Sequence, residues 1–284
     1  MKPNVPASDF TPIGMLKSAG QYEIHIREDG PSQGPPIVLI HGFLGSMRWF
    51  DRLVPLLSHR FRVIRADLLG HGFSSKPHHG YSPENQARVL SLLLNGLGVV
   101  DPIVVGHSMG ADIAISLAEQ GTKVSKLVVV DEAPDYSVAD PSAINKVLRL
   151  PVLGRLLYRN LPTSAHRRAV EGFLAPGRSL AATFDDVAQT VNDVGVVPYA
   201  CFVGSQVEKE RFVAQQPLDE RIAALGVATL VIFGEQDRVF RSGESCVRYR
   251  AVPGIAVQLV PEVGHSPMIE DPVITAEIIH GFIA

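Results

Sequence analysis

Cysteine is nearly absent from this chain of 284 residues, which contains only Cys201 and Cys246. Two thiols are too few for the disulfide framework of a small secreted domain, so we expect both to be free. Long apolar runs are also absent, because the longest stretch without a charged residue, residues 30–47, is interrupted by three prolines and by polar side chains, and the start MKPNVPASDF lacks a signal-peptide pattern. We therefore expect a cytoplasmic protein without stable membrane insertion.

A large excess of either charge is missing as well, since 26 basic and 29 acidic residues leave a formal net charge of −3. This balance excludes the broad basic field that non-specific nucleic-acid binding requires, so nucleic acid is not an expected partner. Hydrophobic residues make up 46% of the chain and charged residues 19%, which predicts a sizeable folded core. The length suits one catalytic domain that carries an insertion.

Short β-branched runs alternate with segments whose apolar residues recur at helical spacing. The runs, which we expect to be strands, are residues 37–40, 61–66, 102–105, 126–130, 228–233 and 255–260. The expected helices are residues 47–58, 83–97, 109–120, 242–251 and 268–283. Nearly continuous apolar runs are typical of strands buried on both faces of a parallel sheet. The pattern predicts a doubly wound, mostly parallel α/β fold, with two antiparallel edge strands within residues 12–28.

The alternation stops after Val130 and resumes near Ala228, and the segment between them is mainly helical in pattern with several prolines. We predict an α/β core of residues 1–132 and 226–284 and a helical lid of residues 133–225. The lid holds a basic stretch that no acid interrupts: Lys146, Arg149, Arg155, Arg159, Arg167 and Arg168. Leucines interleave with these residues. Such a pattern suits anionic ligands or lipid surfaces, but because prolines break it we interpret it as lid helices with an apolar face over the pocket.

The segment Gly106–Gly110 reads GHSMG and lies between a strand-like run and a helical segment. This is the G-x-S-x-G pattern at a strand–turn–helix junction. Ser108 on so tight a turn must hold an unfavourable backbone conformation, and side chains at Gly106 or Gly110 would collide with the neighbouring strand and helix. The turn lifts the hydroxyl above the sheet edge, so Ser108 is the predicted nucleophile.

A serine hydroxyl is a weak nucleophile near neutral pH and needs a base that is itself oriented by an acid. His265 follows the last strand-like run, and Asp237 follows the run before it. Both therefore fall at the carboxyl edge of the sheet, where open α/β folds gather their sites. We predict His265 as the base and Asp237 as the orienting acid, in the chain order expected for this pattern. Asp131, at the end of an earlier strand, is the alternative orienting acid.

Negative charge that develops on a substrate oxygen needs backbone donors from a loop close to the nucleophile. The loop HGFLG, residues 41–45, directly follows a strand-like run. Its glycines let the backbone bend so that the amide of Phe43 faces the site. The amide of Met109 is the second predicted donor, and the two form an oxyanion hole.

Three further polar residues lie in or beside these loops. His41 and His107 are inside the motifs that they frame, and Asp67 follows the run 61–66. We expect all three to brace loops by hydrogen bonding and not to react themselves.

The chain contains five motifs together: HGF-x-G, D-x-x-GHG-x-S, GHSMG, GE-x-D and GHSP-x-x-E-x-P. With this set it resembles the α/β-hydrolase superfamily over roughly residues 36–132 and 226–284. The resemblance implies a sheet of the α/β-hydrolase type with a mainly helical lid insertion. The chain departs from the family at Ala111, where many relatives have a second glycine after the elbow. Serine at position 108 disfavours epoxide hydrolase and haloalkane dehalogenase activities, which typically use aspartate there.

In that superfamily the equivalents of Ser108, Asp237 and His265 form the catalytic triad, which implies hydrolysis of a carboxylic ester or related acyl compound without metal or organic cofactor. The expected partner is a small, apolar acyl substrate, because several lid side chains could line a pocket, although packing in the core is an equal alternative for each: Phe173, Leu174, Phe184, Phe202 and Phe212. A C–C bond hydrolase, a thioesterase or a cofactor-free perhydrolase would use the same residues. The alternative from another class is a ligand-sensing protein on a hydrolase scaffold.

Overall fold

The computed structural model describes residues 13–139 and 143–284. At its centre is one eight-stranded sheet with the strand order β1-β2-β4-β3-β5-β6-β7-β8. The strands are β1 (Met15–Ala19), β2 (Tyr22–Asp29), β3 (Pro36–Ile40), β4 (Arg62–Ala66), β5 (Ile103–His107), β6 (Lys126–Val130), β7 (Thr229–Gly234) and β8 (Ile255–Val260). Strands β3 to β8 pair in parallel, whereas β1 and β2 form an antiparallel edge. The predicted doubly wound, mostly parallel sheet is confirmed.

The central strands are buried on both faces, as the continuous apolar runs predict. Every residue of β5 and of β7 is buried. The same prediction is wrong for β8, in which only Val260 is buried. β8 is the last strand of the sheet. The helices that cover the neighbouring strands end at this edge, so the side chains of β8 are in contact with solvent.

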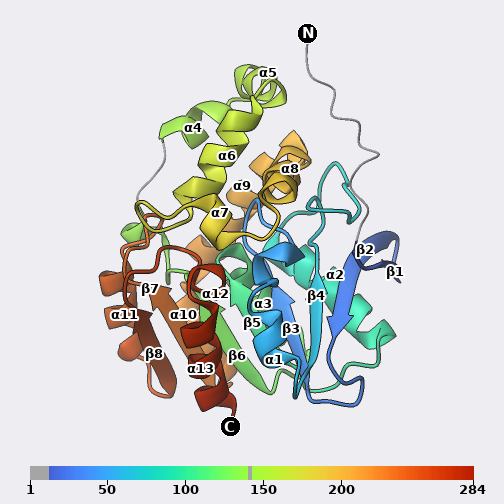
Figure 1. Cartoon of the computed structure of the whole chain (residues 1–284), viewed down its shortest axis with the longest axis vertical. Coiled ribbons are helices and arrows are strands. Elements are labelled where there is room, and N and C mark those ends of the chain that lie inside the picture. Colours follow the sequence, from blue (N-terminus) through green and yellow to red (C-terminus); the bar gives the residue numbers. More distant parts are fainter. Residues whose placement is uncertain (1–12, 140–142) are drawn as a thin grey trace.

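Helices cover both faces of this sheet. The core helices are α1 (Val54–Leu57), α2 (Pro83–Gly96), α3 (Met109–Glu119), α10 (Leu218–Leu225), α11 (Ser242–Arg250), α12 (Pro267–Glu270) and α13 (Pro272–Ile283). α2 and α10 pack against α3 on one face, and α1 packs against α13 on the other (Figure 1). α11 lies against β7 and β8 at the sheet edge.

Two of the predicted crossover helices are each divided in two. Residues 47–58 form a short 3-10 helix, η2 (Met47–Phe50), followed by α1, and residues 268–283 are divided between α12 and α13. Proline explains both divisions, because it lacks an amide hydrogen and can occupy only the first turn of a helix. Pro55 lies in the first turn of α1, and Pro272 in the first turn of α13.

A helical insertion between β6 and β7 is confirmed. It contains η3 (Tyr136–Val138), α4 (Ala143–Leu148), α5 (Leu153–Arg159), α6 (Thr163–Gly172), α7 (Leu180–Thr183), α8 (Val187–Gly195) and α9 (Tyr199–Gln215). Figure 1 shows α4 to α9 gathered beyond one end of the sheet, with α5 farthest from it. The lid boundaries at residues 133 and 225 stay a prediction, and α10, which lies within them, packs on the core helix α3.

The basic stretch of the lid differs from its interpretation. Leu148 is buried, but Leu150, Leu153, Leu156 and Leu157 are exposed, so most of these leucines face solvent and not a pocket. α4 ends at Leu148 and α5 begins at Leu153, with Pro151 between them, so no single helix presents all of the leucines to one side. Nowhere in the described ranges is a helix both long and apolar enough to cross a membrane.

Candidate active site

The structure explains both glycines of the GHSMG segment. Ser108 connects β5 to α3 with φ 49° and ψ −128°, a backbone conformation that residues with a side chain rarely adopt. A Cβ added at Gly106 would lie 2.4 Å from the carbonyl oxygen of Gly110, and one added at Gly110 would lie 2.2 Å from that of Ile40. Only glycine fits at either position, so the turn holds Ser108 at the carboxyl end of β5.

His265 and Asp237 are brought together, as their positions after neighbouring strands predict. His265 donates a hydrogen bond from Nδ1 to Oδ2 of Asp237 at 2.9 Å. The other carboxylate oxygen of Asp237 accepts the amides of Val239 and Phe240 at 2.6 and 3.3 Å. Both side chains of the pair are almost fully buried, with 1% and 0% of their surface exposed. This contact leaves Nε2 of the neutral His265 ring free of a proton, so that nitrogen can accept one.

The loop of His265 is attached to the serine turn through the residue before Ser108. His107 donates from Nε2 to the carbonyl oxygen of His265 at 2.7 Å, and the two imidazole rings have centroids 5.1 Å apart. The hydrogen bonds recorded for the described residues include none from the Ser108 hydroxyl. Apo active sites often have catalytic hydrogen bonds that form only when substrate binds.

Asp131, the alternative acid, lies beside this pair without contacting the imidazole by a hydrogen bond. Its Oδ1 accepts the amide of Gly234 at 2.8 Å, and its backbone has φ 47°. Burial, and then the nearby charge of Asp237, raise the pKa of Asp131 well above its ordinary value. A protonated acid is a poor partner for an imidazolium, so the geometry favours Asp237 as the residue that orients His265.

Within residues 13–139 and 143–284, one cluster of potential metal ligands lies at this site. The side chains of Asp131, Asp237 and His265 place one potential ligand atom each within 4.8 Å of one another. The nitrogen of His265 that faces the acids is already the donor to Asp237, and Asp131 already accepts the amide of Gly234. These hydrogen bonds hold the cluster together, and Oδ2 of Asp131 is its one buried oxygen without a hydrogen-bond partner among the described residues.

The loop that follows β3 packs directly on the serine turn. A Cβ added at Gly42 would lie 3.0 Å from Cβ of Ser108 and 2.9 Å from Nδ1 of His107, so glycine is needed for this close approach. The amides of Phe43 and Met109 take part in none of the hydrogen bonds found among the described residues. Both amides are therefore available to a substrate oxygen, as an oxyanion hole requires.

Buried polar side chains hold this loop in place. His41 donates from Nδ1 to the carbonyl oxygen of Gly42 at 2.8 Å and accepts the amide of Leu68 at Nε2 at 3.0 Å. Asp67 accepts the amide of Met47 at 2.9 Å and a hydrogen bond from His25 at 2.8 Å. Although burial opposes ionisation, these hydrogen bonds and nearby imidazoles hold the pKa of Asp67 at about 2. The predicted bracing roles of His41, His107 and Asp67 are confirmed.

Aromatic side chains enclose His265. The rings of Phe173 and Phe240 each have their centroids 5.7 Å from that of His265, and Phe173 comes from the lid. Phe43 lies 5.6 Å from Phe202 of α9. The lid thus contributes apolar surface next to His265, and Ser108 itself is 7% exposed.

Two of the predicted pocket residues lie elsewhere. Phe184 packs edge to face on Trp49, with ring centroids 5.6 Å apart. Phe212 lies under the guanidinium of Arg221, 3.8 Å from the ring centroid, and is buried in the core. Neither ring is among the aromatic rings that pair with His265 in the described part of the chain, and both side chains are buried.

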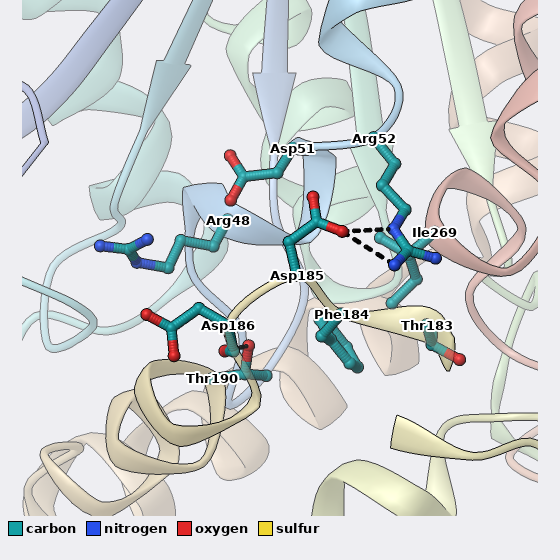
Figure 2. A pocket seen from close by; sticks show the side chains of 9 residues that line it. All are labelled: Arg48, Asp51, Arg52, Thr183, Phe184, Asp185, Asp186, Thr190 and Ile269. Atoms are coloured by element: carbon teal, nitrogen blue, oxygen red, sulfur yellow. Dashed lines mark hydrogen bonds and ion pairs between the residues drawn. The ribbon is translucent and has the colours of Figure 1, made fainter. Parts of the chain in front are cut away.

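A small cavity lies between η2 and the connection from α7 to α8 (Figure 2). Its volume of about 10 Å³ is enough for one water molecule and too small for a substrate. An ion pair beside it joins Arg52 to Asp185 at 2.8 Å and connects the lid to the core. Ser108, Asp237 and His265 do not line this cavity. The cavity is therefore part of the contact between the lid and the core.

Glu270 is a supporting residue that the sequence reasoning missed. Its carboxylate accepts the amides of Ala175, Gly264 and Ser266 at 2.8, 3.1 and 3.3 Å. Two of these amides flank His265, and the third belongs to the lid. The signal was present in the sequence, because Glu270 is the acid of the GHSP-x-x-E-x-P motif.

We expect Glu270→Ala to lower the free energy of unfolding by about 3 kcal/mol, because three buried amides lose their acceptor. Turnover should fall as well, since the His265 loop loses its support. Urea denaturation and initial rates on p-nitrophenyl acetate measure the two effects. Glu277→Ala is the matched control, as that side chain is exposed on α13, and it should change stability by less than about 0.5 kcal/mol. Equal behaviour of the two variants would contradict this role.

Asp193 of α8 is a second residue that only the structure reveals. Its carboxylate accepts hydrogen bonds from Oγ of Ser46 at 2.7 Å and from Nε2 of Gln189 at 2.6 Å. Ser46 caps η2 directly after the HGFLG loop, so Asp193 connects the lid to the predicted oxyanion loop. Burial raises the pKa of Asp193 to about 6, despite the hydrogen bonds that it accepts.

This raised pKa predicts the direction in which stability changes with pH. Between pH 4 and 6 the folded protein holds the Asp193 proton more tightly than the unfolded chain does, so stability falls as pH rises through that window. Asp193→Asn cannot ionise. Relative to this variant, the wild type should lose about 2 kcal/mol of unfolding free energy between pH 4.5 and pH 7. Urea denaturation at both pH values measures the difference, and a difference that does not change with pH would contradict the assignment.

Comparison with known proteins identifies the family of this chain. The model of the alpha/beta hydrolase fold family matches residues 35–272. The chain belongs to the α/β-hydrolase family. The match includes strands β3 to β8 and the helical insertion, whereas β1 and β2 lie before it.

Relatives of this α/β-hydrolase include enzymes with different substrates. It is 26% identical to 2-(acetamidomethylene)succinate hydrolase of Mesorhizobium japonicum, over 93% of this chain and 92% of that protein. It is 28% identical to Lipase 1 of Psychrobacter immobilis, over 93% of this chain and 81% of the lipase. Among solved structures, that of a putative aryl esterase from Burkholderia cenocepacia superimposes with a TM-score of 0.79 at 20% identity, covering 95% of this chain and 97% of the esterase.

Proposed function

We propose that this α/β-hydrolase cleaves a carboxylic ester or related acyl compound through an acyl-enzyme on Ser108. The observation that carries the proposal is the buried 2.9 Å hydrogen bond from His265 to Asp237, in a loop attached to the turn that holds Ser108. That contact fixes the imidazole tautomer in which Nε2 can take a proton from a serine. The family membership and the esterase and lipase relatives add support.

The proposed reaction has two halves. Oγ of Ser108 attacks the substrate carbonyl carbon while Nε2 of His265 takes the hydroxyl proton, and the amides of Phe43 and Met109 stabilise the oxyanion. The tetrahedral intermediate then expels the alcohol, which receives that proton from His265. Water, deprotonated by His265, attacks the acyl carbon next, and collapse of this second intermediate releases the acid and restores the serine hydroxyl.

The surroundings of the site favour an apolar acyl or alkyl group. Phe43, Phe173, Phe202 and Phe240 contribute rings beside the candidate catalytic residues. Apolar lining with a few polar groups is typical of small-molecule sites. We therefore expect a substrate with enough apolar surface to contact these rings.

Active-site labelling together with a substrate panel tests this proposal. A fluorophosphonate should label Ser108, as peptide mass mapping of the labelled protein would show, and a panel of p-nitrophenyl esters, thioesters and lactones should reveal turnover. The member of the panel with the highest kcat/KM separates an esterase from a thioesterase. Labelling of a different residue would refute the nucleophile, and labelling of Ser108 without turnover of any compound would favour a ligand-sensing protein.

A further inference from the structure

The tip of the lid, formed by residues 146–159 of α4 and α5 and the turn between them, exposes a group of large apolar side chains. Their exposed fractions are Val147 43%, Leu150 47%, Val152 84%, Leu153 49%, Leu156 61% and Leu157 40%. These are six of the seventeen large apolar residues that are exposed in the described part of the chain. Single exposed apolar residues are normal on a protein surface, but a cluster of this kind marks an interaction site.

The turn between α4 and α5 explains why these side chains face outward. A Cβ added at Gly154 would lie 2.1 Å from the carbonyl oxygen of Leu148, so the two short helices meet backbone to backbone. Leu148 and Gly154 occupy this contact and are buried. The remaining leucines lie outside this contact between the two helices, and their side chains face solvent.

Positive charge surrounds this apolar surface. Lys146, Arg155 and Arg159 of the lid tip and Arg168 of α6 are exposed. The sequence has no acidic residue between Asp140 and Glu171, although the whole chain carries a net charge of −3. The lid tip is therefore locally basic on an otherwise acidic protein.

We propose that the lid tip docks this protein on the surface of an anionic lipid bilayer. An apolar surface rimmed by lysine and arginine suits the boundary between lipid headgroups and acyl chains. The leucines and valines would enter the acyl layer, and the basic side chains would contact lipid phosphates. Because no described helix can span a bilayer, the docking is peripheral and reversible.

Shape and charge favour a bilayer over the other occupants of an apolar surface. The lid tip is the part of the molecule farthest from the sheet (Figure 1), so it can reach a flat surface before any other element does. A second copy joined by a twofold axis would bring two basic surfaces against each other, which costs energy. Docking would also place the lid, which contributes Phe173 beside His265, at the membrane.

Flotation of the full-length protein with unilamellar vesicles tests the proposal. The protein should bind vesicles of phosphatidylcholine that contain about one third phosphatidylglycerol, and bind pure phosphatidylcholine vesicles at least about tenfold more weakly. Rising salt should weaken binding to the anionic vesicles. Equal binding to both kinds of vesicle, or none to either, would overturn the proposal.

Two variants separate the apolar from the electrostatic contribution. Leu153→Ser with Leu156→Ser should abolish flotation. Arg155→Gln with Arg159→Gln should weaken it by about thirtyfold, because the loss of each basic side chain near an anionic surface weakens binding by about fivefold. Val247→Ser with Val273→Ser is the matched control, because both valines are exposed elsewhere, on α11 and α13, and it should float like the wild type. Unchanged flotation of the lid-tip variants, or loss in the control, would contradict the assignment.

Further measurements distinguish docking from folding, self-association and catalysis. The lid-tip variants should keep the wild-type melting temperature and rate on soluble p-nitrophenyl acetate, since their side chains are exposed and lie outside the active site. Ser108→Ala should float like the wild type, so docking and chemistry can fail independently. A stable dimer in sedimentation velocity that is lost in the Leu153→Ser, Leu156→Ser variant would assign the surface to a second copy and overturn the lipid proposal.

Discussion

Replacing Ser108 by alanine is expected to lower turnover of p-nitrophenyl acetate by about 10⁴- to 10⁶-fold. The nucleophile, base and acid of such a site act as a unit, so removing one member forfeits nearly the whole contribution of the group. The residual rate should come from the amides of Phe43 and Met109, which the substitution leaves in place. Burst kinetics should also disappear, because no acyl-enzyme can accumulate.

The substitution is a clean one in structural terms. Alanine removes only Oγ, and that atom makes no recorded hydrogen bond among the described residues. The φ of 49° at position 108 disfavours alanine about as much as serine, so the melting temperature should change little. Near-full activity in a folded Ser108→Ala variant, or fluorophosphonate labelling that persists in it, would identify another nucleophile.

Replacing Asp237 by asparagine is expected to reduce kcat by about 10⁴-fold, whereas Asp131→Asn should reduce it by less than about tenfold. Asparagine at 237 presents either a neutral oxygen or an NH2 group to Nδ1 of His265. The negative charge that stabilises the imidazolium is then lost. An NH2 group facing Nδ1 also favours the tautomer in which the proton is on Nε2, and that nitrogen can then no longer accept one. Asparagine at 131 can still accept the amide of Gly234. It is also neutral, like the protonated acid that burial and Asp237 favour by raising the pKa of Asp131.

The two variants control for each other, because both remove one ionisable oxygen from the same buried cluster. Initial rates between pH 6 and 9 give kcat and KM for each, and circular dichroism verifies that both are folded. If Asp131→Asn caused the larger loss in kcat, the orienting role would belong to Asp131. If neither variant lost more than tenfold, the triad itself would be the wrong description of the site.

Local patterns predicted much of the fold because each rests on short-range physics. Apolar runs such as 126–130 coincide with strands, since a strand buried on both faces needs apolar residues at consecutive positions. The GHSMG segment predicted its own turn, because the clashes that exclude other residues from Gly106 and Gly110 come from the neighbouring strand and helix. The position of β8 at the sheet edge was not predictable in this way, as an edge is a property of the whole sheet.

Contacts between segments that lie far apart in the sequence were not predicted. Glu270 binds an amide of the lid 95 residues away, and Asp193 binds Ser46 147 residues away. No periodicity or spacing links such pairs, because the polar partner of a buried carboxylate is chosen by the packing of the whole domain. The leucines of the lid tip were assigned to the wrong environment for the same reason.

The sequence predicted Ser108, Asp237 and His265 as the catalytic residues, since each follows a strand whose carboxyl end can be read from composition. The tertiary structure shows that Asp237, the predicted acid, and not Asp131 is the hydrogen-bond partner of His265. Both acids follow buried parallel strands, and only the path of the loops after β7 and β8 places the Asp237 oxygen 2.9 Å from the imidazole. It also decided which lid side chains face the triad and which face solvent, because burial depends on what folds over a residue and not on its neighbours in the chain.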